Sequence, residues 1–425
     1  YDGAWNNVWN YSGISTSSHG AWTTFNPKTT PAMEGVRDIV RIAVDPQNPK
    51  HVFAGSWGAG ILEFENGEFV QLYDDTNTDG GLSNIIPGKR FVRIGGLAFD
   101  SQNNLWASNS SVPSPIVVKK TDGTWKNFPY GTFTGDAFTG KLEIIQGGGY
   151  ADVKWVQLPR GNGLFAFYNG PDLDDTSDDL YQKISVRAIW PQNNIKVLND
   201  IYSMAVDHEN NLWIGTSNGV ALYYAPNRVF NDYPRGNFYC EQPNVDQGDS
   251  LYHALLETEI VTAIAVDGAN RKWFGTRNSG VFLTDPDGNK LIKSFNVINS
   301  PLLSNNIFSI TINQDSGEVY FATEAGIVSY QGDAITEAPN ETQIYAFPNP
   351  VRPDYEGPIT IRGVAANSIV KITDINANLV YETESLGGQV IWNGKDLQGQ
   401  RVHSGVYLVL SSTSMGEKKS IAKIL

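Results

Sequence analysis

The sequence is poor in several features that would assign it to a familiar class of protein. It has one cysteine, Cys240, so no intrachain disulfide can form. Only 18% of its residues are charged, and acidic residues outnumber basic ones to give a formal net charge of −14. Because nucleic acid is bound by a positive field that meets its phosphates, this charge excludes nucleic acid as a partner. It also argues against docking on an anionic membrane by bulk charge.

Long apolar runs are missing as well. No stretch approaches the roughly 18 consecutive apolar residues of a membrane-spanning helix, so no transmembrane segment is expected. The chain starts at Tyr1 without a Met or a signal peptide, and we interpret it as a mature product or a fragment. Its 425 residues are enough for two domains.

A repeat dominates the first part of the chain. Each copy reads as an alternating apolar strand, a polar turn rich in Asn and Gly, a second strand that opens with an aromatic residue, and a third strand. The aromatic positions lie roughly 50 residues apart, which is the length of one four-stranded propeller blade. They are Phe53, Trp106, Trp155, Trp213, Trp273 and Tyr320.

These repeats predict an all-β fold that begins with a β-propeller of six to seven blades. The strip around Trp22 precedes the first copy and reads as another outer strand, so we expect it to close the last blade. Because the tryptophans recur at one position of the repeat, packing between blades explains them better than sugar stacking at a single site.

A polar linker at 337–342 separates the repeats from a segment of different character. Pro348 and Pro350 prevent a central strand there, Asn393-Gly394 is a hairpin signal, and 406–410 alternates as a strand does. We predict a propeller domain over 1–338 and a small Ig-like β-sandwich over 339–425.

Both parts resemble known families. The repeats are similar to the regulator-propeller repeat, through Gly81-Leu82-Ser83-Asn84 and Leu212-Trp213-Ile214-Gly215-Thr216. The last segment resembles the C-terminal sorting domain of the type IX secretion system of Bacteroidetes. The residues that carry this second resemblance are Pro348, Asn349, Pro350, Gly394, Asp396, Gly405, Tyr407, Lys418, Lys419 and Lys423.

A regulator propeller joined to a sorting domain is similar to a component of the surface attachment complex of that secretion system. The resemblance implies a non-enzymatic protein on the extracellular face of the outer membrane, reached by export through the periplasm. Its implied partners are the sortase, other outer-membrane components of the system, and anionic lipopolysaccharide, which it would bind or present.

An exported cargo is the alternative, because in most cargo the sortase removes the sorting domain and attaches lipopolysaccharide. The propeller of such a cargo would bind or cleave a glycan. A sensor ectodomain fits less well, since the sorting domain stands where a transmembrane helix should follow.

Long insertions between the repeats predict a ligand surface, because loops on the rim of a propeller are where ligands bind. Arginine beside aromatic rings suits a phosphorylated sugar. The predicted surface consists of Arg160, Arg187, Trp190, Arg228, Arg235 and Tyr239.

No cofactor is expected, with calcium as a weak possibility. Asp75, Asn77 and Asp79 fit the opening of a calcium loop, in which oxygen ligands alternate. The closing glutamate would fall at Ile86, so a solvated turn is the competing interpretation. Cys240 reads as an incidental free thiol.

Overall fold

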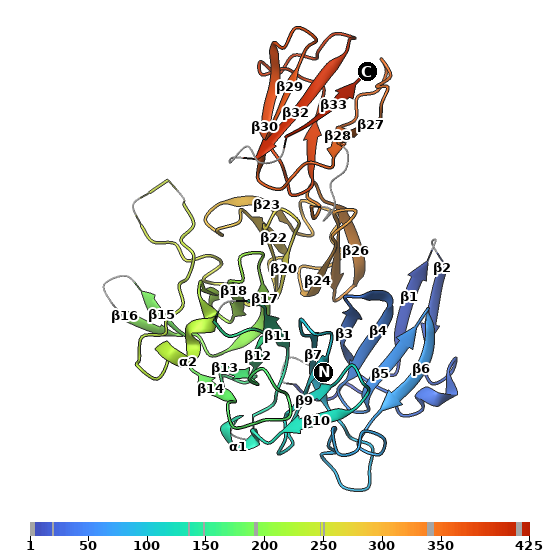
Figure 1. Cartoon of the computed structure of the whole chain (residues 1–425), viewed down its shortest axis with the longest axis vertical. Coiled ribbons are helices and arrows are strands. Elements are labelled where there is room, and N and C mark those ends of the chain that lie inside the picture. Colours follow the sequence, from blue (N-terminus) through green and yellow to red (C-terminus); the bar gives the residue numbers. More distant parts are fainter. Residues whose placement is uncertain are drawn as a thin grey trace. The chain divides into compact units, whose positions relative to one another are not determined.

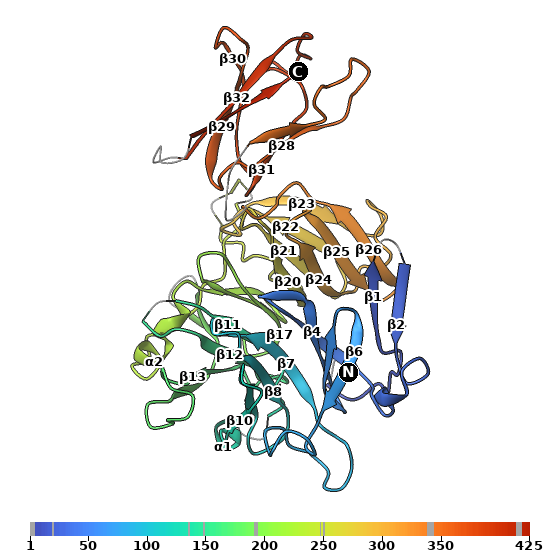
Figure 2. The same cartoon turned by 45° about the vertical axis from the view of Figure 1, so that its right-hand side comes forward.

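The computed structural model describes residues 5–18, 21–134, 137–147, 149–190, 194–246, 248–249, 251–337, 344–413 and 419–425. The chain divides into two compact units, Tyr1–Gln242 and Pro243–Leu425. Almost all regular structure in both units is antiparallel β-sheet (Figure 1, Figure 2). Among the described residues, no helix is long and apolar enough to span a bilayer.

Four sheets of the first unit follow the repeats, and within each sheet the chain runs back and forth between neighbouring strands. The first sheet holds β3 (Ile39–Asp45), β4 (Asn48–Ser56), β5 (Gly60–Glu65) and β6 (Glu68–Tyr73). The second holds β7 (Ile94–Phe99), β8 (Leu105–Asn109), β9 (Ile116–Lys119) and β10 (Trp125–Phe128). The third holds β11 (Leu142–Ile145), β12 (Val153–Gln157), β13 (Leu164–Tyr168) and β14 (Leu180–Ile184). The fourth holds β17 (Ile201–Val206), β18 (Leu212–Thr216) and β19 (Gly219–Tyr223).

Two hairpins and short helical turns complete the first unit. β1 (Ile14–Ser18) and β2 (Ala21–Phe25) pair with each other, so closure of the last blade by this strip stays a prediction. The insertion after the third sheet forms a second hairpin of β15 (Arg187–Trp190) and β16 (Asn194–Val197). Among the described residues of this unit, the helices are α1 (Gly131–Thr134), α2 (Val229–Asp232) and the 3₁₀ turns Pro31–Met33 and Pro226–Arg228.

The second unit contains two more repeat sheets. One holds β20 (Val261–Val266), β21 (Lys272–Thr276), β22 (Val281–Thr284) and β23 (Leu291–Phe295), and the other holds β24 (Ile307–Asn313), β25 (Glu318–Thr323) and β26 (Gly326–Gln331). Val281 and Leu283 pack with Ile307 and Phe321 in the core between these sheets. The alternating apolar side chains of one sheet thus pack against those of the next sheet, as in the blades of a propeller.

A β-sandwich of two sheets ends the second unit. Val370, Ile372, Trp392 and Val409 lie in the core that the two sheets share. One sheet holds β27 (Tyr345–Phe347), β28 (Ile359–Arg362) and β31 (Gln389–Trp392), and the other holds β30 (Leu379–Glu384), β29 (Ser368–Thr373), β32 (Tyr407–Thr413) and β33 (Lys419–Ile424).

The predicted fold class, an all-β propeller followed by a β-sandwich, is confirmed. The predicted domain boundary at 338 and 339 falls beside residues that lie outside the described ranges, and it stays a prediction.

Candidate functional site

A buried pair of aspartate and tryptophan recurs where the first strand of a repeat turns into the second. The indole Nε1 donates to the carboxylate in Trp106–Asp100 and Trp213–Asp207, at 2.8 Å in each. Trp273 donates to Asp267 in the same way at 3.3 Å. All of these indoles are buried. They are parts of the core and present no ring face to a sugar.

The degenerate repeat lacks this pair. Trp155 is fully buried, but its Nε1 has no hydrogen-bond partner, because no aspartate stands at the end of β11. Its ring instead stacks against Tyr223 and Phe238, with ring centres 6.0 and 6.2 Å away.

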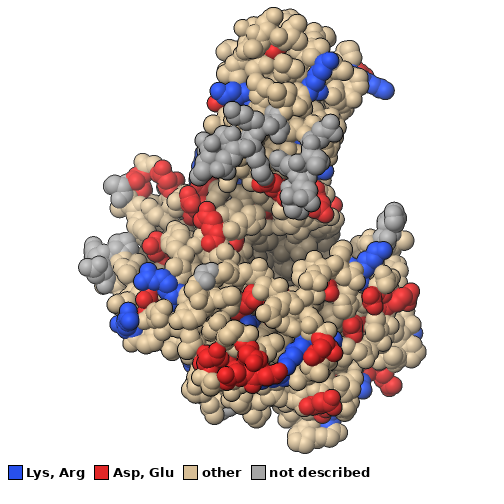
Figure 3. All heavy atoms as spheres, viewed as in Figure 1, with Lys and Arg blue, Asp and Glu red and all other residues tan. Residues whose placement is uncertain are grey.

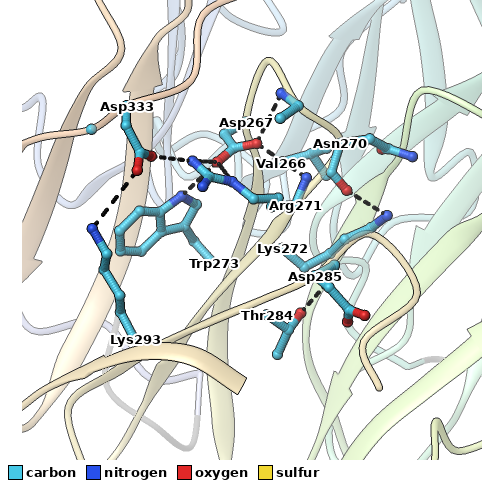
Figure 4. A network of polar contacts seen from close by, with 12 residues as sticks. Val266, Asp267, Asn270, Arg271, Lys272, Trp273, Thr284, Asp285, Lys293 and Asp333 are labelled. Atoms are coloured by element: carbon cyan, nitrogen blue, oxygen red, sulfur yellow. Dashed lines mark hydrogen bonds and ion pairs between the residues drawn. The ribbon is translucent and has the colours of Figure 1, made fainter. Parts of the chain in front are cut away.

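In the repeat that holds β20 to β23, an arginine adds further contacts to the pair of Trp273 and Asp267 (Figure 4). Arg271 donates from Nε to Asp267 at 2.8 Å and from Nη2 to Asp333 at 2.6 Å. Lys293 Nζ lies 3.8 Å from the other oxygen of Asp333. Because Arg271 is buried, both carboxylates are needed to stabilise its charge. The network fastens Asp333, which follows β26, to the turn before β21.

The segment from Asp333 to Glu337 also binds the sandwich. The backbone oxygen of Asp333 accepts from Gln389 Nε2 at 2.8 Å, and the oxygen of Ile335 accepts from Gly388 N at 2.9 Å. The carboxylate of Glu337 accepts from Ala366 N at 3.0 Å. We call residues 333–337 the bridge, because they hydrogen-bond both the repeat sheet and the sandwich.

Two glycines make room for the bridge. A Cβ on Gly268 would lie 2.0 Å from the carbonyl carbon of Ile335, and one on Gly387 would lie 1.9 Å from the oxygen of Ile335. The sequence patterns did not predict the bridge. Gly387-Gly388, just before β31, was the signal that could have drawn attention to it.

The residues that the sequence predicts as a sorting motif hold the sandwich closed. Asn349 Nδ2 donates to Lys423 O at 2.9 Å, and Leu425 N donates to Asn349 Oδ1 at 3.0 Å. The Pro-Asn-Pro turn, with Pro348 and Pro350 both in cis peptide bonds, is therefore fixed to the closing strand.

The other motif residues shape turns and a small cavity. Asp396 Oδ1 accepts from Gln400 N at 2.8 Å, which caps the turn after Gly394. Gly394, Gly405 and Tyr407 line a cavity of about 170 Å³. Lys418 lies outside the described residues, and the side chain of Lys419 is not described either. Recognition of these residues by a translocon stays a prediction.

The predicted ligand surface is only partly assembled. The guanidinium of Arg187 lies 5.5 Å from the ring centre of Tyr233 and 5.0 Å from that of Tyr239. Arg228 pairs with Asp232 at 2.8 Å, and the ring of Trp190 lies 4.4 Å from Lys196 Nζ. The structure therefore joins Arg187 and Tyr239.

The other residues of the predicted ligand surface do not join the contact between Arg187 and Tyr239. Arg160 belongs to the turn between β12 and β13, where its guanidinium lies 4.2 Å from the ring centre of Phe138. Arg235 is exposed, and its backbone N donates to Asp232 O at 3.2 Å. Cys240 is buried and forms an isolated backbone β-bridge with Ala188. Burial raises the pKa of its thiol to about 12. A thiol with such a pKa is not a nucleophile at neutral pH.

The first unit also contains a polar cavity of about 530 Å³ between its second and third sheets. Asp100, Asp152 and Asn169 are buried at its wall. Lys154, only 1% exposed, lies with its Nζ 4.1 Å from the ring centre of Trp106 and donates to Asn169. Burial lowers the pKa of Lys154 to about 8.

The predicted calcium loop is a hydrogen-bonded turn. Asn77 Oδ1 accepts from Asp74 N at 3.0 Å, and Asn77 Nδ2 donates to Leu72 O at 2.9 Å. Asp75 accepts from the amide of Asn84 at 3.3 Å, and Asp79 is exposed. No group of three His, Cys, Asp or Glu residues suited to a metal occurs in the described part of the chain. Calcium binding stays an untested expectation.

Comparisons with known proteins agree with the fold. A family model for the two component regulator propeller matches residues 197–218. No curated protein matches the chain. The extracellular domain of the hybrid two component system BT4673 of B. thetaiotaomicron is 13% identical, with a TM-score of 0.46 over 98% of this chain and 55% of that one.

A much stronger similarity is to PorZ, an essential surface component of the type IX secretion system of Porphyromonas gingivalis. The two are 30% identical, with a TM-score of 0.70, over 99% of this chain and 57% of PorZ. The chain therefore spans little more than half the length of PorZ. The sequence predicted a resemblance to a surface component of this secretion system, and PorZ is that component. The resemblance covers nearly the whole length of this chain.

Proposed function

We propose that the chain is a non-enzymatic component of the type IX secretion attachment machinery on the cell surface. It would scaffold the sortase and bind or present anionic lipopolysaccharide on the extracellular face of the outer membrane. The observation that carries this proposal is the similarity to PorZ, since it extends over 99% of the chain and so includes both the repeats and the sandwich.

The bridge favours a component that keeps its C-terminal sandwich over a cargo that loses it. Residues 333–337 accept hydrogen bonds from Gln389 and Gly388 of the sandwich as well as from Arg271 of the repeat. Removing the sandwich would leave the backbone oxygens of Asp333 and Ile335 without these partners. Backbone groups that lose their partners cost free energy unless water replaces them.

Any contact with an anionic glycan would have to be local, because the chain as a whole is acidic. On the face drawn in Figure 3, acidic side chains gather near β10 and α1 of the first unit. Arginines beside aromatic rings, such as Arg187 beside Tyr233 and Tyr239, are the groups suited to such a contact.

The first test is the mass of the protein's C-terminal peptide, measured on native cells. We expect the sandwich to be retained, so that its residues up to Leu425 are recovered in the mature protein. A chain cut near Phe347 that carries lipopolysaccharide would instead identify an exported cargo and would overturn the proposal.

The second test is deletion of the gene in the host bacterium. We expect other exported proteins to accumulate in the periplasm with their sorting domains attached, and the full-length gene to restore their export. Normal export without the gene would contradict a role in the machinery.

A further inference from the structure

Three arginines from different repeats converge in the first unit, with aromatic rings between them. Arg37 and Arg93 stand just before the first strands β3 and β7, and Arg160 lies in the turn after β12. The ring centre of Phe91 is 5.0 Å from the Cζ of both Arg37 and Arg93. That of Phe138 is 5.4 Å from Arg93 Cζ and 4.2 Å from Arg160 Cζ. We call Arg37, Phe91, Arg93, Phe138 and Arg160 the arginine ladder.

The positive charges of Arg37 and Arg93 are not balanced by a carboxylate in the part of the chain that the structure describes. Their hydrogen-bond acceptors are neutral: Arg37 Nη1 donates to Gly35 O, and Arg93 Nη2 donates to Asn7 Oδ1, each at 3.0 Å. The Nε of each is buried without a partner, and Arg37 is only 8% exposed.

Like charges therefore face one another at short range. Arg37 and Arg93 share one ring at 5.0 Å, so their charges lie within about 10 Å, the Debye length at 0.1 M salt. Burial, and then the charges of Arg160 and Arg37, lower the pKa of Arg93. Asp38 is the carboxylate next in the chain, but it accepts from Asn7 Nδ2 and from Asn10 N, at 2.9 Å each.

The fold does not require an arginine at the position of Arg93. In five repeats the residue before the first strand uses its backbone oxygen as an acceptor, as Arg93 does for Ser110 N at 2.8 Å. The side chain at that position varies freely. The equivalent residues are Asp38, Arg93, Asp200, Ile260 and Asn306.

Aromatic rings also border the ladder. Trp57, fully buried, has its ring centre 5.2 Å from Arg93 Cζ. Trp9 is 56% exposed, with its ring centre 4.8 Å from Arg37 Cζ. An exposed indole beside the guanidinium of Arg37 offers a stacking face and charge-assisted hydrogen bonds together.

We propose that the arginine ladder is a binding site for an anionic sugar. Its arginines hold the phosphate or carboxylate, and Trp9 stacks on the sugar ring. An anion there would balance the facing charges of Arg37 and Arg93. This deepens the proposed function by naming a ligand class and its place, and it rests on that function only for the source of the sugar.

The test is a calorimetric titration of the full chain with glucose 1-phosphate, glucuronate, glucose and inorganic phosphate. We expect both anionic sugars to bind, with affinity that falls as salt is added. Glucose should bind at least about tenfold more weakly, because it lacks the charged group. Equal affinity for inorganic phosphate and glucose 1-phosphate would overturn the role of the sugar ring. Absence of binding by both anionic sugars would overturn the site.

Variants locate the binding. Arg93→Gln and Arg37→Gln should each lower the affinity for glucose 1-phosphate by about tenfold or more. Trp9→Ala should lower the affinity for glucose 1-phosphate while leaving that for inorganic phosphate unchanged. The control is Arg352→Gln, which removes an exposed arginine of the sandwich and should not change affinity. Melting curves show whether each variant is folded, and Arg93→Gln should melt no earlier than wild type because a repulsion is relieved. Unchanged affinity in folded Arg93→Gln and Arg37→Gln would overturn the site.

The same variants separate this inference from the proposed function. If Arg93→Gln loses sugar binding but restores export in the deletion strain, the site exists and lipopolysaccharide is not its source of ligand. If deletion does not impair export, the proposed function fails while the titrations still decide the site.

Discussion

At the scale of single residues, Lys154 is a lysine buried among aromatic rings. Burial lowers its pKa to about 8, while Asp100, Asp152 and Asp179 act against the shift. A lysine in the unfolded chain has a pKa near 10.4, so the unfolded state binds more protons between about pH 8 and pH 10.4. Stability therefore rises with pH across that window as the cost of the buried charge is relieved.

We accordingly predict that Lys154→Met is more stable than wild type by about 1–2 kcal/mol at pH 7, with the gain vanishing towards pH 10. Urea unfolding at a series of pH values measures the difference. Lys154→Arg is the control, because it keeps its charge at every pH and should gain nothing. A gain that is the same at pH 7 and pH 10 would show that charge burial is not its cause.

At the scale of elements, the turn between the first and second strands depends on its aspartate. Asp207 is buried and accepts from Trp213 Nε1 at 2.8 Å and from Asn211 N at 2.9 Å. Asp207→Ala leaves these donors unsatisfied and should destabilise the chain by about 2–4 kcal/mol in denaturant unfolding. Glu209→Ala, in the same turn but exposed, should cost less than about 0.5 kcal/mol. Equal losses would contradict the importance of the buried pair.

The bridge offers a second prediction at this scale. In Gly387→Ala the new Cβ would collide with the oxygen of Ile335, so the bridge should separate from the sandwich. Hydrogen exchange at the amide of Gly388 should accelerate, because that amide donates to Ile335 O. Gly399→Ala is the matched control, since Gly399 also has a positive φ but no heavy atom within 4 Å of its Cβ position. Similar acceleration in both variants would mean backbone strain, and not the collision, is responsible.

At the scale of the whole molecule, the net charge of −14 opposes binding to an anionic surface. We predict that the chain does not sediment with phosphatidylglycerol vesicles at about 0.15 M salt, where charges beyond about 8 Å are screened. Co-sedimentation would show that a local basic surface outweighs the bulk charge. In that event, Arg93→Gln and Arg187→Gln would tell which of the two arginine sites is responsible.

Most of the fold was open to prediction from local patterns, whereas the site was not. The alternation around Trp213 and the turn at Asp207 lie close together in sequence, and so they predict one sheet at a time. Arg160 was predicted to join Arg187, but the two contact different rings. No local pattern gives the distance between side chains of different sheets, because packing between the sheets sets it.

The sequence by itself determined the sheets, the turns and the sandwich, because strand alternation and turn chemistry act over a few residues. Only the tertiary structure decided which distant side chains meet. Arg93 shares Phe91 with Arg37 and Phe138 with Arg160 because the first three repeat sheets pack against one another. The bridge joins a repeat to the sandwich because Gly268 and Gly387 let their backbones approach Ile335.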